Sequence, residues 1–453
     1  MVVQADRETQ RGQASILWSS CLAMLAVGAN STAIMAALPS MRADLSLSTA
    51  GVQWAINAYL VASAACIVLG GQAADRLGAR PASIGGLALF ALASCVVALA
   101  GTQAVLLAGR TLQGLAAALA VPSTLAAVGA GAEAERKTAA IGAWTGFLML
   151  GFSIGPLLGG AVTHLIGWRV IFWLNALLMS AAIVGLASAV SPLASWQGHP
   201  RRRTDWIGFV LLAIVMVSLV FGLHAVPDAM AAPLSVVGPL VLAIAAFLLL
   251  MTVEGRLEAP LVDRSFFARR GFAVGVGVGS LSMFSIMSLL LYFNLYAQSP
   301  EGLGLTALQA GASLLPLSAA LLALALSASA IVKRFGPRSA VAGGMALVAI
   351  ASGVIGAAVS GDSMVLLAMG LLLMGAGLSV PYALAPRLAL SALSPTQVGQ
   401  GSGIVNACTF LGGSAGVAVG ATAFAFGGFV AVMAMIACAG ILGAVLAQGI
   451  AEP

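Results

Sequence analysis

The sequence predicts an all-α, polytopic membrane protein with fourteen transmembrane helices. Of its 453 residues, 61% are hydrophobic and 8% are charged, whereas soluble domains use roughly 25% charged residues to cover their surface. Apolar runs longer than ~18 residues, the length that crosses a bilayer as a helix, recur along the whole chain. The basic residues between these runs fall mostly in alternate loops, and therefore on one side of the membrane, as expected of a chain that crosses it repeatedly.

Turn residues and charges divide the chain into the individual spans. The first apolar run follows a polar N-terminus and is too long for the core of a signal peptide, so we expect it to remain as a helix. Together with the next five runs it forms a first group of six. Two more runs follow as a pair, and six form a last group. The predicted spans are 16–38, 52–74, 81–100, 104–128, 138–166, 168–190, 206–226, 233–253, 271–297, 307–332, 339–359, 364–384, 399–424 and 428–448.

The basic residues predict the orientation of these spans. If the N-terminus is inside and the loops alternate, seventeen of the 20 Lys and Arg residues lie on the inner side. Arg42 and Arg169 lie outside, and Arg110 lies within a span. This is the distribution that the positive-inside rule describes. We therefore expect a bacterial-type inner membrane protein with both termini cytoplasmic, and the net charge of +6 indicates orientation rather than binding of nucleic acid.

The sequence also contains an internal repeat. Segment 75–96 aligns with segment 333–354 at a shift of 258 positions, with twelve of 22 pairs identical, and the triplet Gly151, Gly155 and Gly159 recurs at a shift of 261. A repeat in the same topology is typical of transporters whose two halves are related by an axis along the membrane normal. The predicted domains are a six-helix bundle at 1–190, a cytoplasmic linker with two inserted helices at 191–270, and a second six-helix bundle at 271–453.

Five short motifs carry a resemblance to a known family. They are GQAADRLGAR at 71–80, RTLQG at 110–114, GFSIGPLLGG at 151–160, Trp54 with Tyr59, and GSGIVN at 401–406. Together they resemble the fourteen-helix drug:proton antiporter branch of the major facilitator superfamily over nearly the whole chain. The resemblance implies the major facilitator fold and a secondary transporter that exports lipophilic or amphiphilic small molecules by rocker-switch alternating access.

Two departures from that family's pattern remove polarity from the expected central cavity. Members commonly carry Asp-x-Thr in the first helix, where this chain has Asn30 and Thr32 around Ser31. An Arg-Gln pair usually follows the helix-thirteen Asn, where this chain has Thr409 and Phe410. Selection for cationic drugs is therefore not expected.

The loop motif between the second and third spans is a candidate gate. Its residues are Gly71, Asp75, Arg76, Gly78 and Arg80. Glycine allows a tight turn, and the charges could pair between the bundles or cap a helix of the other half. Contacts of this kind form in one state and break in the other. The alternative is a short solvated loop that follows the charge rule.

The exporter-type motif on the fifth span is a candidate bending interface. Gly151, Gly155 and Gly159 lie four residues apart, with Gly160 beside them, and such spacing lets two helix backbones approach closely. Pro156 is expected to kink the helix or loosen its hydrogen bonds.

Arg110, with Gln113 on the same helical face, is the candidate for substrate binding or coupling. A charge inside the bilayer costs ~3 kcal/mol or more, so Arg110 is expected to face the bundle interior and to be hydrogen-bonded. The functional interpretation, which the family motif implies, is a cavity residue that binds substrate, with neutral or anionic amphiphiles suiting it best, or couples to protons. The alternative is a structural strut bonded to a neighbouring helix.

The remaining cavity candidates are polar, aromatic and Met residues on helices that line the pathway in family members. As a set they indicate a large, weakly polar and adaptable pocket. They are Asn30, Asn57, Trp144, Met149, Phe284, Met287, Tyr292, Tyr382, Asn406 and Phe410.

Proton coupling stays open at the level of sequence. The resemblance implies protons as a partner, but all 14 acidic residues lie in tails, loops or helix ends, and proton transfer usually needs an ionisable group inside the membrane. An uncoupled facilitator, or an exporter of a neutral or anionic amphiphile without proton antiport, is the alternative. An enzyme would need clustered His, Asp or metal ligands, so we expect no catalytic site, metal or cofactor, and a monomer in the lipid bilayer.

Overall fold

The computed structural model describes residues 2–131, 134–189, 206–226, 232–255, 264–394 and 397–450, and every structural statement below is confined to them. Within these ranges the chain forms helices and turns, and no strand is present. The predicted all-α class is confirmed. The placement predicted for Arg201, Arg202, Arg203 and Arg256 falls on residues outside the described part of the chain.

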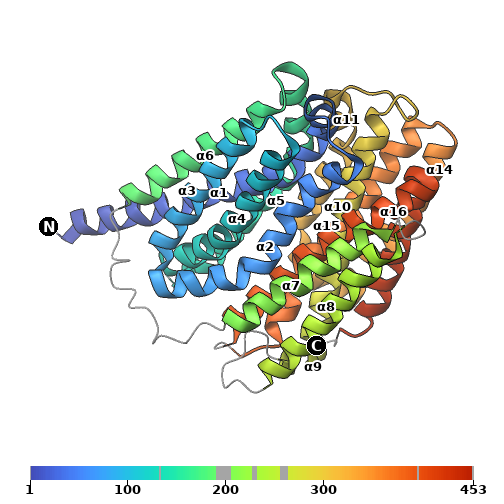
Figure 1. Cartoon of the computed structure of the whole chain (residues 1–453). Coiled ribbons are helices and arrows are strands. Elements are labelled where there is room, and N and C mark those ends of the chain that lie inside the picture. The colour runs from blue at the N-terminus through green and yellow to red at the C-terminus, as the bar shows by residue number, and fades with distance from the viewer. Residues whose placement is uncertain are drawn as a thin grey trace.

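The chain folds into two groups of helices that lie side by side, with a hairpin of two helices next to them (Figure 1). Apolar runs become helices because a bilayer offers no partner for a free backbone N–H or C=O. The N-terminal half contains α1 (Val2–Leu45), α2 (Thr49–Leu77), α3 (Ala79–Ala98), α4 (Gln103–Gly131), α5 (Ala134–Leu165) and α6 (Arg169–Ser188).

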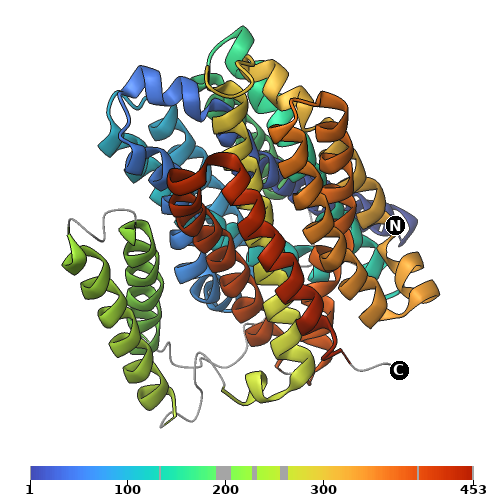
Figure 2. The same ribbon diagram turned by 90° about the vertical axis from the view of Figure 1, so that its right-hand side faces the viewer.

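The inserted hairpin consists of α7 (Trp206–His224) and α8 (Pro233–Glu254). Figure 2 shows it standing apart from the two main groups. It packs through α7 against α2 of the first half and α16 of the second. The C-terminal half contains α9 (Arg264–Ala268), α10 (Arg270–Gln298), α11 (Ala307–Ser313), α12 (Leu315–Leu326), α13 (Ala328–Phe335), α14 (Pro337–Ser360), α15 (Met364–Ser391) and α16 (Val398–Ala447).

The last element, α16, contains two membrane spans. Its apolar part covers 48 residues, about 72 Å of helix, which is more than twice the thickness of a bilayer core. The helix is interrupted at Gly427 (φ −150°, ψ 23°) and Gly428 (φ 61°, ψ −154°), and the second of these conformations suits a residue without a Cβ. The thirteen candidate spans among the described residues, of which this one crosses twice, therefore make fourteen crossings, as predicted.

One predicted span is broken rather than continuous. The sequence predicts a single helix over 307–332, but the structure has α11, α12 and α13 in its place. Pro316 has no N–H to continue the ladder of helical hydrogen bonds, and α11 ends just before it at Ser313, with Leu314 as its C-cap. A second break lies at Ser327, whose hydroxyl donates to the Ala323 carbonyl at 3.1 Å.

The two ends of the bundle differ in charge. We call the end where α2 meets α3 and α13 meets α14 the basic end; it carries Arg80, Lys333 and Arg338. The opposite end, where α1 meets α2 and α10 meets α11, is called the far end. Both chain termini and the start of α7 belong to the basic end by helix alternation.

The internal repeat is visible at the basic end of both halves. Gly78 (φ 90°, ψ 146°) and Gly336 (φ 79°, ψ 156°) hold the same left-handed turn. Arg80 donates from Nε to the Leu186 carbonyl at 2.9 Å, at the end of α6. Arg338 donates from Nε to Oε1 of Gln448 at 2.9 Å, at the end of α16. In each half, the arginine after the turn binds the end of that half's sixth span.

Each half is held together by close backbone contact at its glycines. A Cβ on Gly151, Gly155 or Gly159 would lie within 3.0 Å of α1 atoms, and the equivalent triplet of α16 meets α10 in the same way. Where the backbones approach this closely, a hydroxyl also crosses: Thr32 donates to the Phe152 carbonyl at 3.1 Å, and Ser280 to that of Cys408 at 3.0 Å. Small residues at these positions are what brings the helices together.

Two alanine substitutions on α5 test this packing. Gly151→Ala places a Cβ 2.8 Å from the backbone nitrogen of Ala29, so the helices must move apart, at a cost of about 1–3 kcal/mol. Gly146→Ala meets nothing within 4 Å, and alanine favours a helix by up to ~1 kcal/mol over glycine. We expect the midpoint of thermal unfolding in detergent to fall for the first variant and to stay or rise for the second. Equal midpoints would contradict the packing argument.

Candidate functional site

The two halves are in close backbone contact at the far end, through α5 and α11. A Cβ on Gly311 would touch the Pro156 carbonyl oxygen and lie 3.2 Å from Cα of Leu157. Gly160 of α5 contacts the Ala307 carbonyl of α11 in the same manner. Gln298 of α10 adds a hydrogen bond from Nε2 to the Ala36 carbonyl of α1 at 3.0 Å. The far end of the interface is therefore closed.

A second contact between the halves runs along α2 and α16. Ser414 donates to Oδ1 of Asn57 at 2.9 Å, and both residues are fully buried. Towards the basic end, Gly403 faces the Val68 side chain. Helix α7 lies against this same seam: the Trp54 ring centroid is 4.4 Å from that of Phe221.

On the basic side of the α5–α11 contact, α5 is less covered. A Cβ on Gly142 or Gly146 would meet nothing within 4 Å, and Gly142 is exposed. The packing of α5 thus changes along its length, from open near the basic end to close contact near the far end.

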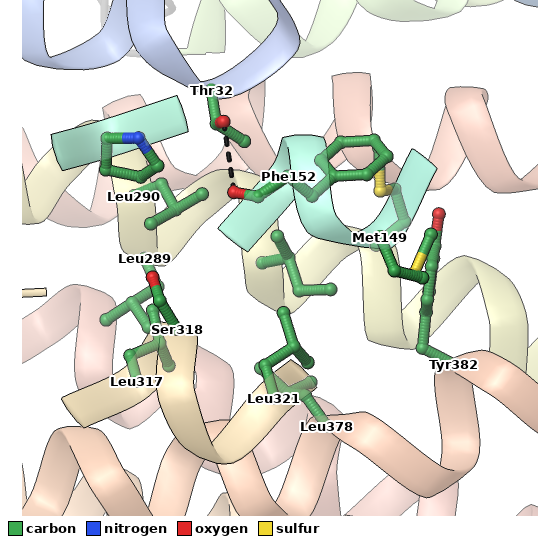
Figure 3. A pocket seen from close by; sticks show the side chains of 13 residues that line it. Thr32, Met149, Phe152, Leu289, Leu290, Leu317, Ser318, Leu321, Leu378 and Tyr382 are labelled. Carbon is green, nitrogen blue, oxygen red and sulfur yellow. Dashed lines mark hydrogen bonds between the residues drawn. The ribbon is translucent and has the colours of Figure 1, made fainter. Parts of the chain in front are cut away.

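A pocket lies between the halves, bounded by α1 and α5 on one side and α10, α12 and α15 on the other (Figure 3). In this conformation it encloses about 20 Å³, room for roughly one water molecule. The Phe152 and Tyr382 rings, one from each half, stand edge to face with centroids 6.4 Å apart. The pocket is lined by Thr32, Met149, Phe152, Pro156, Met283, Ile286, Leu289, Leu290, Leu317, Ser318, Leu321, Leu378 and Tyr382.

The pocket wall is apolar with a few hydroxyl groups. None of the lining side chains is charged, and three carry a hydroxyl: Thr32, Ser318 and Tyr382. Thr32 already donates its proton within the first half (Figure 3). Met149 and Met283 are flexible side chains that adapt to ligands of different shape. A wall of this kind suits an uncharged, largely apolar ligand better than an ion.

Three of the residues singled out in the sequence line this pocket, namely Met149, Pro156 and Tyr382. On α10 the predicted positions, Phe284 and Met287, are each one residue away from lining positions, Met283 and Ile286. One residue is a rotation of about 100° on a helix, so the prediction selected the neighbouring face. The apolar spacing does not distinguish the two faces, because Phe284, Met287 and Leu291 repeat in the same way as Met283, Ile286 and Leu290.

Other predicted cavity residues form hydrogen bonds within their own half. Asn30 accepts from Nδ2 of Asn175 at 2.8 Å, and Trp144 donates to the Thr124 hydroxyl at 3.2 Å. The Tyr292 hydroxyl donates to the Val417 carbonyl at 2.5 Å. Asn406 donates to the Ser402 carbonyl within α16 at 2.9 Å, and Phe410 packs partly buried against the core.

Arg110 is fully buried inside the N-terminal half. Its Nε donates to the Ala55 carbonyl of α2 at 2.7 Å, and its Nη1 to Oε1 of Gln113 at 2.7 Å. Gln113 in turn donates to the Ser94 hydroxyl of α3 at 2.8 Å. The guanidinium lies 4.7 Å from the centroid of the Tyr59 ring, and its Nη2 has no hydrogen-bond partner in the described structure. These contacts join α2, α3 and α4, and Arg110 does not line the pocket between the halves.

The loop motif at the basic end corrects one expectation. Its charges were expected to pair between the halves or to cap a helix of the other half, yet Arg80 binds the Leu186 and Ala187 carbonyls of α6 in its own half. The reason is local, because the last carbonyls of α6 have no partner within that helix and a cation near a helix C-terminus is favourable. Asp75 and Arg76 are exposed beside it.

A second hollow, of about 410 Å³, opens near the basic end. It lies between α2, α4 and the first residue of α7, Trp206. Its wall is apolar except for Gln72 and Arg76. It lies beside the N-terminal half and does not join the two halves.

Comparisons with known proteins identify the family. Residues 20–417 match the family model described as Major Facilitator Superfamily. The chain is 30% identical over 411 residues to the tetracenomycin C resistance and export protein of Streptomyces glaucescens, covering 89% of this chain and 75% of that protein. It is 31% identical over 422 residues to the cephamycin export protein CmcT of Amycolatopsis lactamdurans, covering 88% and 82%.

The fold is also that of a solved transporter. The crystal structure of the human organic anion transporter MFSD10 (TETRAN) superimposes with a TM-score of 0.65 at 19% identity, covering 97% of this chain and 99% of that one. With two helical halves, a pocket between them and a family match over most of its length, this multi-pass membrane protein belongs to the major facilitator superfamily and is a transporter rather than an enzyme.

Proposed function

We propose that this transporter exports lipophilic or amphiphilic small molecules by rocking its two halves about the pocket between α1, α5, α10, α12 and α15. The observation that carries the proposal is the pocket wall, which joins both halves and consists of apolar side chains, two methionines and three hydroxyl groups. The relatives named as antibiotic export proteins support the direction of transport.

The orientation follows from the charges. The basic end carries most of the Lys and Arg residues, and we place it in the cytoplasm of a bacterium with both termini, following the positive-inside rule. The far end, closed by Gly160 and Gly311, then faces outwards. The molecule is in a conformation closed to the outside, with α5 less covered towards the cytoplasm.

The pocket must widen to hold a substrate. Its 20 Å³ compares with roughly 300–1,000 Å³ for sites that bind drug-sized molecules. Separation of the halves about the α5–α11 contact would supply the space, since the two walls belong to different halves. Neutral amphiphiles fit this wall best, because Arg110, the residue that would favour anions, bonds to α2 and Gln113 instead.

We propose that the proton gradient drives export, as the family resemblance implies. The rival is an uncoupled facilitator. In liposomes containing the purified chain, a coupled exporter accumulates a substrate faster when a pH gradient is imposed, whereas an uncoupled one shows the same flux with and without it. A substrate panel tested in a strain lacking its own efflux pumps supplies the compound for this assay.

Blocking the pocket is the first test of this function. Ser318→Phe places a ring in the 20 Å³ space. We expect export of the panel compounds to fall by about tenfold or more, because each loss of about 1.4 kcal/mol of binding free energy lowers the affinity tenfold. Ser360→Phe, at the exposed end of α14, is the control and should leave export unchanged. Membrane levels and thermal midpoints of both variants are measured alongside. Normal export by a well-folded Ser318→Phe variant would move the substrate site elsewhere.

A second test separates the two interpretations of Arg110. Arg110→Gln removes the bond to the Ala55 carbonyl and the contact with the Tyr59 ring. If Arg110 is a strut, the thermal midpoint falls, because breaking a buried charged network costs about 3–5 kcal/mol, while flux per folded molecule and its pH dependence persist. Loss of coupled flux at an unchanged thermal midpoint would favour the cavity interpretation instead.

A further inference from the structure

A chain of hydrogen bonds joins the inserted hairpin to both halves of the transporter. At the last turn of α7, Nε2 of His224 lies 3.2 Å from Nδ2 of Asn57 on α2. Oδ1 of Asn57 accepts from the Ser414 hydroxyl of α16 at 2.9 Å. The chain thus runs from α7 through the N-terminal half to the C-terminal half.

The hydrogen-bond partners of the imidazole, with the Asn57 amide oriented as in this structure, correspond to its neutral form. Nδ1 of His224 lies 3.1 Å from the Val220 carbonyl oxygen, which can only accept, so Nδ1 carries a hydrogen. Asn57 presents its amide N–H₂ to Nε2, so Nε2 must accept with its lone pair. This orientation of the Asn57 amide therefore goes with a neutral His224.

We propose that His224 is a proton-binding site at the far end of this transporter, and that its occupancy reverses the direction of the hydrogen bond between the halves. The inference rests on the proposed transport function and names a group that responds to the pH at the far end. A proton from water at the far end binds the Nε2 lone pair and forms an imidazolium with an N–H at both nitrogens. Two donors, Nε2–H and the Asn57 N–H₂, would then face each other.

Rotation of the Asn57 amide by 180° resolves this conflict. Oδ1 then accepts from Nε2–H of His224, and Nδ2 turns towards Ser414, whose hydroxyl oxygen accepts and whose proton turns to a carbonyl of its own helix. No covalent bond other than N–H forms, and the proton returns from Nε2 to water at the far end when the sequence reverses. The bond between the halves, which Ser414 donates in the neutral state, is then donated by Asn57.

The surroundings of His224 favour opening of the far end on protonation. His224 is partly exposed, whereas Asn57 and Ser414 are completely buried. An imidazolium is stabilised by water, so the charged state of His224 is stabilised when the halves separate at the far end and water enters. The Trp54 ring, 5.2 Å from that of His224, covers its other side.

No other described ionisable group has an interaction with His224. On the helices packed against α7, Asp75 lies about 27 Å along α2 from Asn57, and Tyr59 instead faces Arg110. Asp228 follows His224 by four positions and lies outside the described residues. The ionisable side chains on these helices are Tyr59, Cys66, Asp75 and Arg76 on α2, Glu254 on α8, and Cys408 and Cys438 on α16.

Distances across the far end test the proposal without a substrate. Spin labels replace Leu165 and Met364, exposed residues of opposite halves at that end, in the full chain with its five cysteines changed to serine. As the pH falls from about 8 to 5.5, the range in which histidine titrates, we expect the population with the longer label-to-label distance to increase. The ratio of the two populations should change roughly fivefold, the scale of one hydrogen bond.

Four variants make the outcome specific. His224→Gln cannot bind a proton but can still accept from Asn57, and its distances should not depend on pH. Ser414→Ala should also lose the pH response, because it removes the hydrogen bond that joins Asn57 to the C-terminal half. His164→Gln, an exposed histidine at the same end, and Asp228→Asn should respond like the parent chain. A full pH response in His224→Gln, or its loss in Asp228→Asn alone, would overturn the proposal.

The transport assay distinguishes this inference from the proposed function. In liposomes, His224→Gln should lose the acceleration that acid pH on the far-end side gives the parent chain but keep substrate exchange at equal pH, so the exporter works without this proton site. Absence of any flux from the parent chain would instead reject the transport function while leaving the distance measurements interpretable.

Discussion

Close contact between helix backbones at glycine is the constraint on which this structure depends. Inside a bilayer, lipid tails are as apolar as leucine, so helices associate through close packing rather than through exclusion of water. The α1–α5 and α10–α16 pairs achieve this at Gly151 and Gly416, where a Cβ would overlap the neighbouring backbone. Each half is therefore closely packed, and the same kind of contact at Gly160 and Gly311 brings the two halves together at one end.

The fold could be predicted from the sequence because its signals are additive along the chain. Span length, charge distribution and the repeat around Gly78 and Gly336 each depend on local residues, and all three agree with the structure. The break at Leu314 was not predicted, because the segment 307–332 is apolar along its whole length and so favours a single helix despite Pro316. The pocket was harder to predict, since which face of α10 lines it depends on helix rotation: Met283 lines it, and the predicted Phe284 is the next residue along the helix.

Arg110 shows why a buried charge need not mark a ligand site. The sequence isolates it as a charge within a span, and the structure surrounds it with a carbonyl, an amide and an aromatic face from the same half. Such partners satisfy a guanidinium without a carboxylate, at the expense of one unpaired Nη2. The pocket is left with hydroxyl groups as its polar elements, which separates the charge that organises the N-terminal half from the surface that meets the substrate.

A proton site at His224 would extend this separation to the response of the transporter to pH at its far end. A carboxylate inside the pocket would compete with a neutral substrate for the same space and would favour cations. At the seam of α2, α7 and α16, a titrating group instead acts on the hydrogen bond between Asn57 and Ser414, so the pocket can remain uncharged. The inserted hairpin would then have a mechanical reason to lie against this seam: α7 carries the imidazole, and Trp54 and Phe221 hold the helix in place.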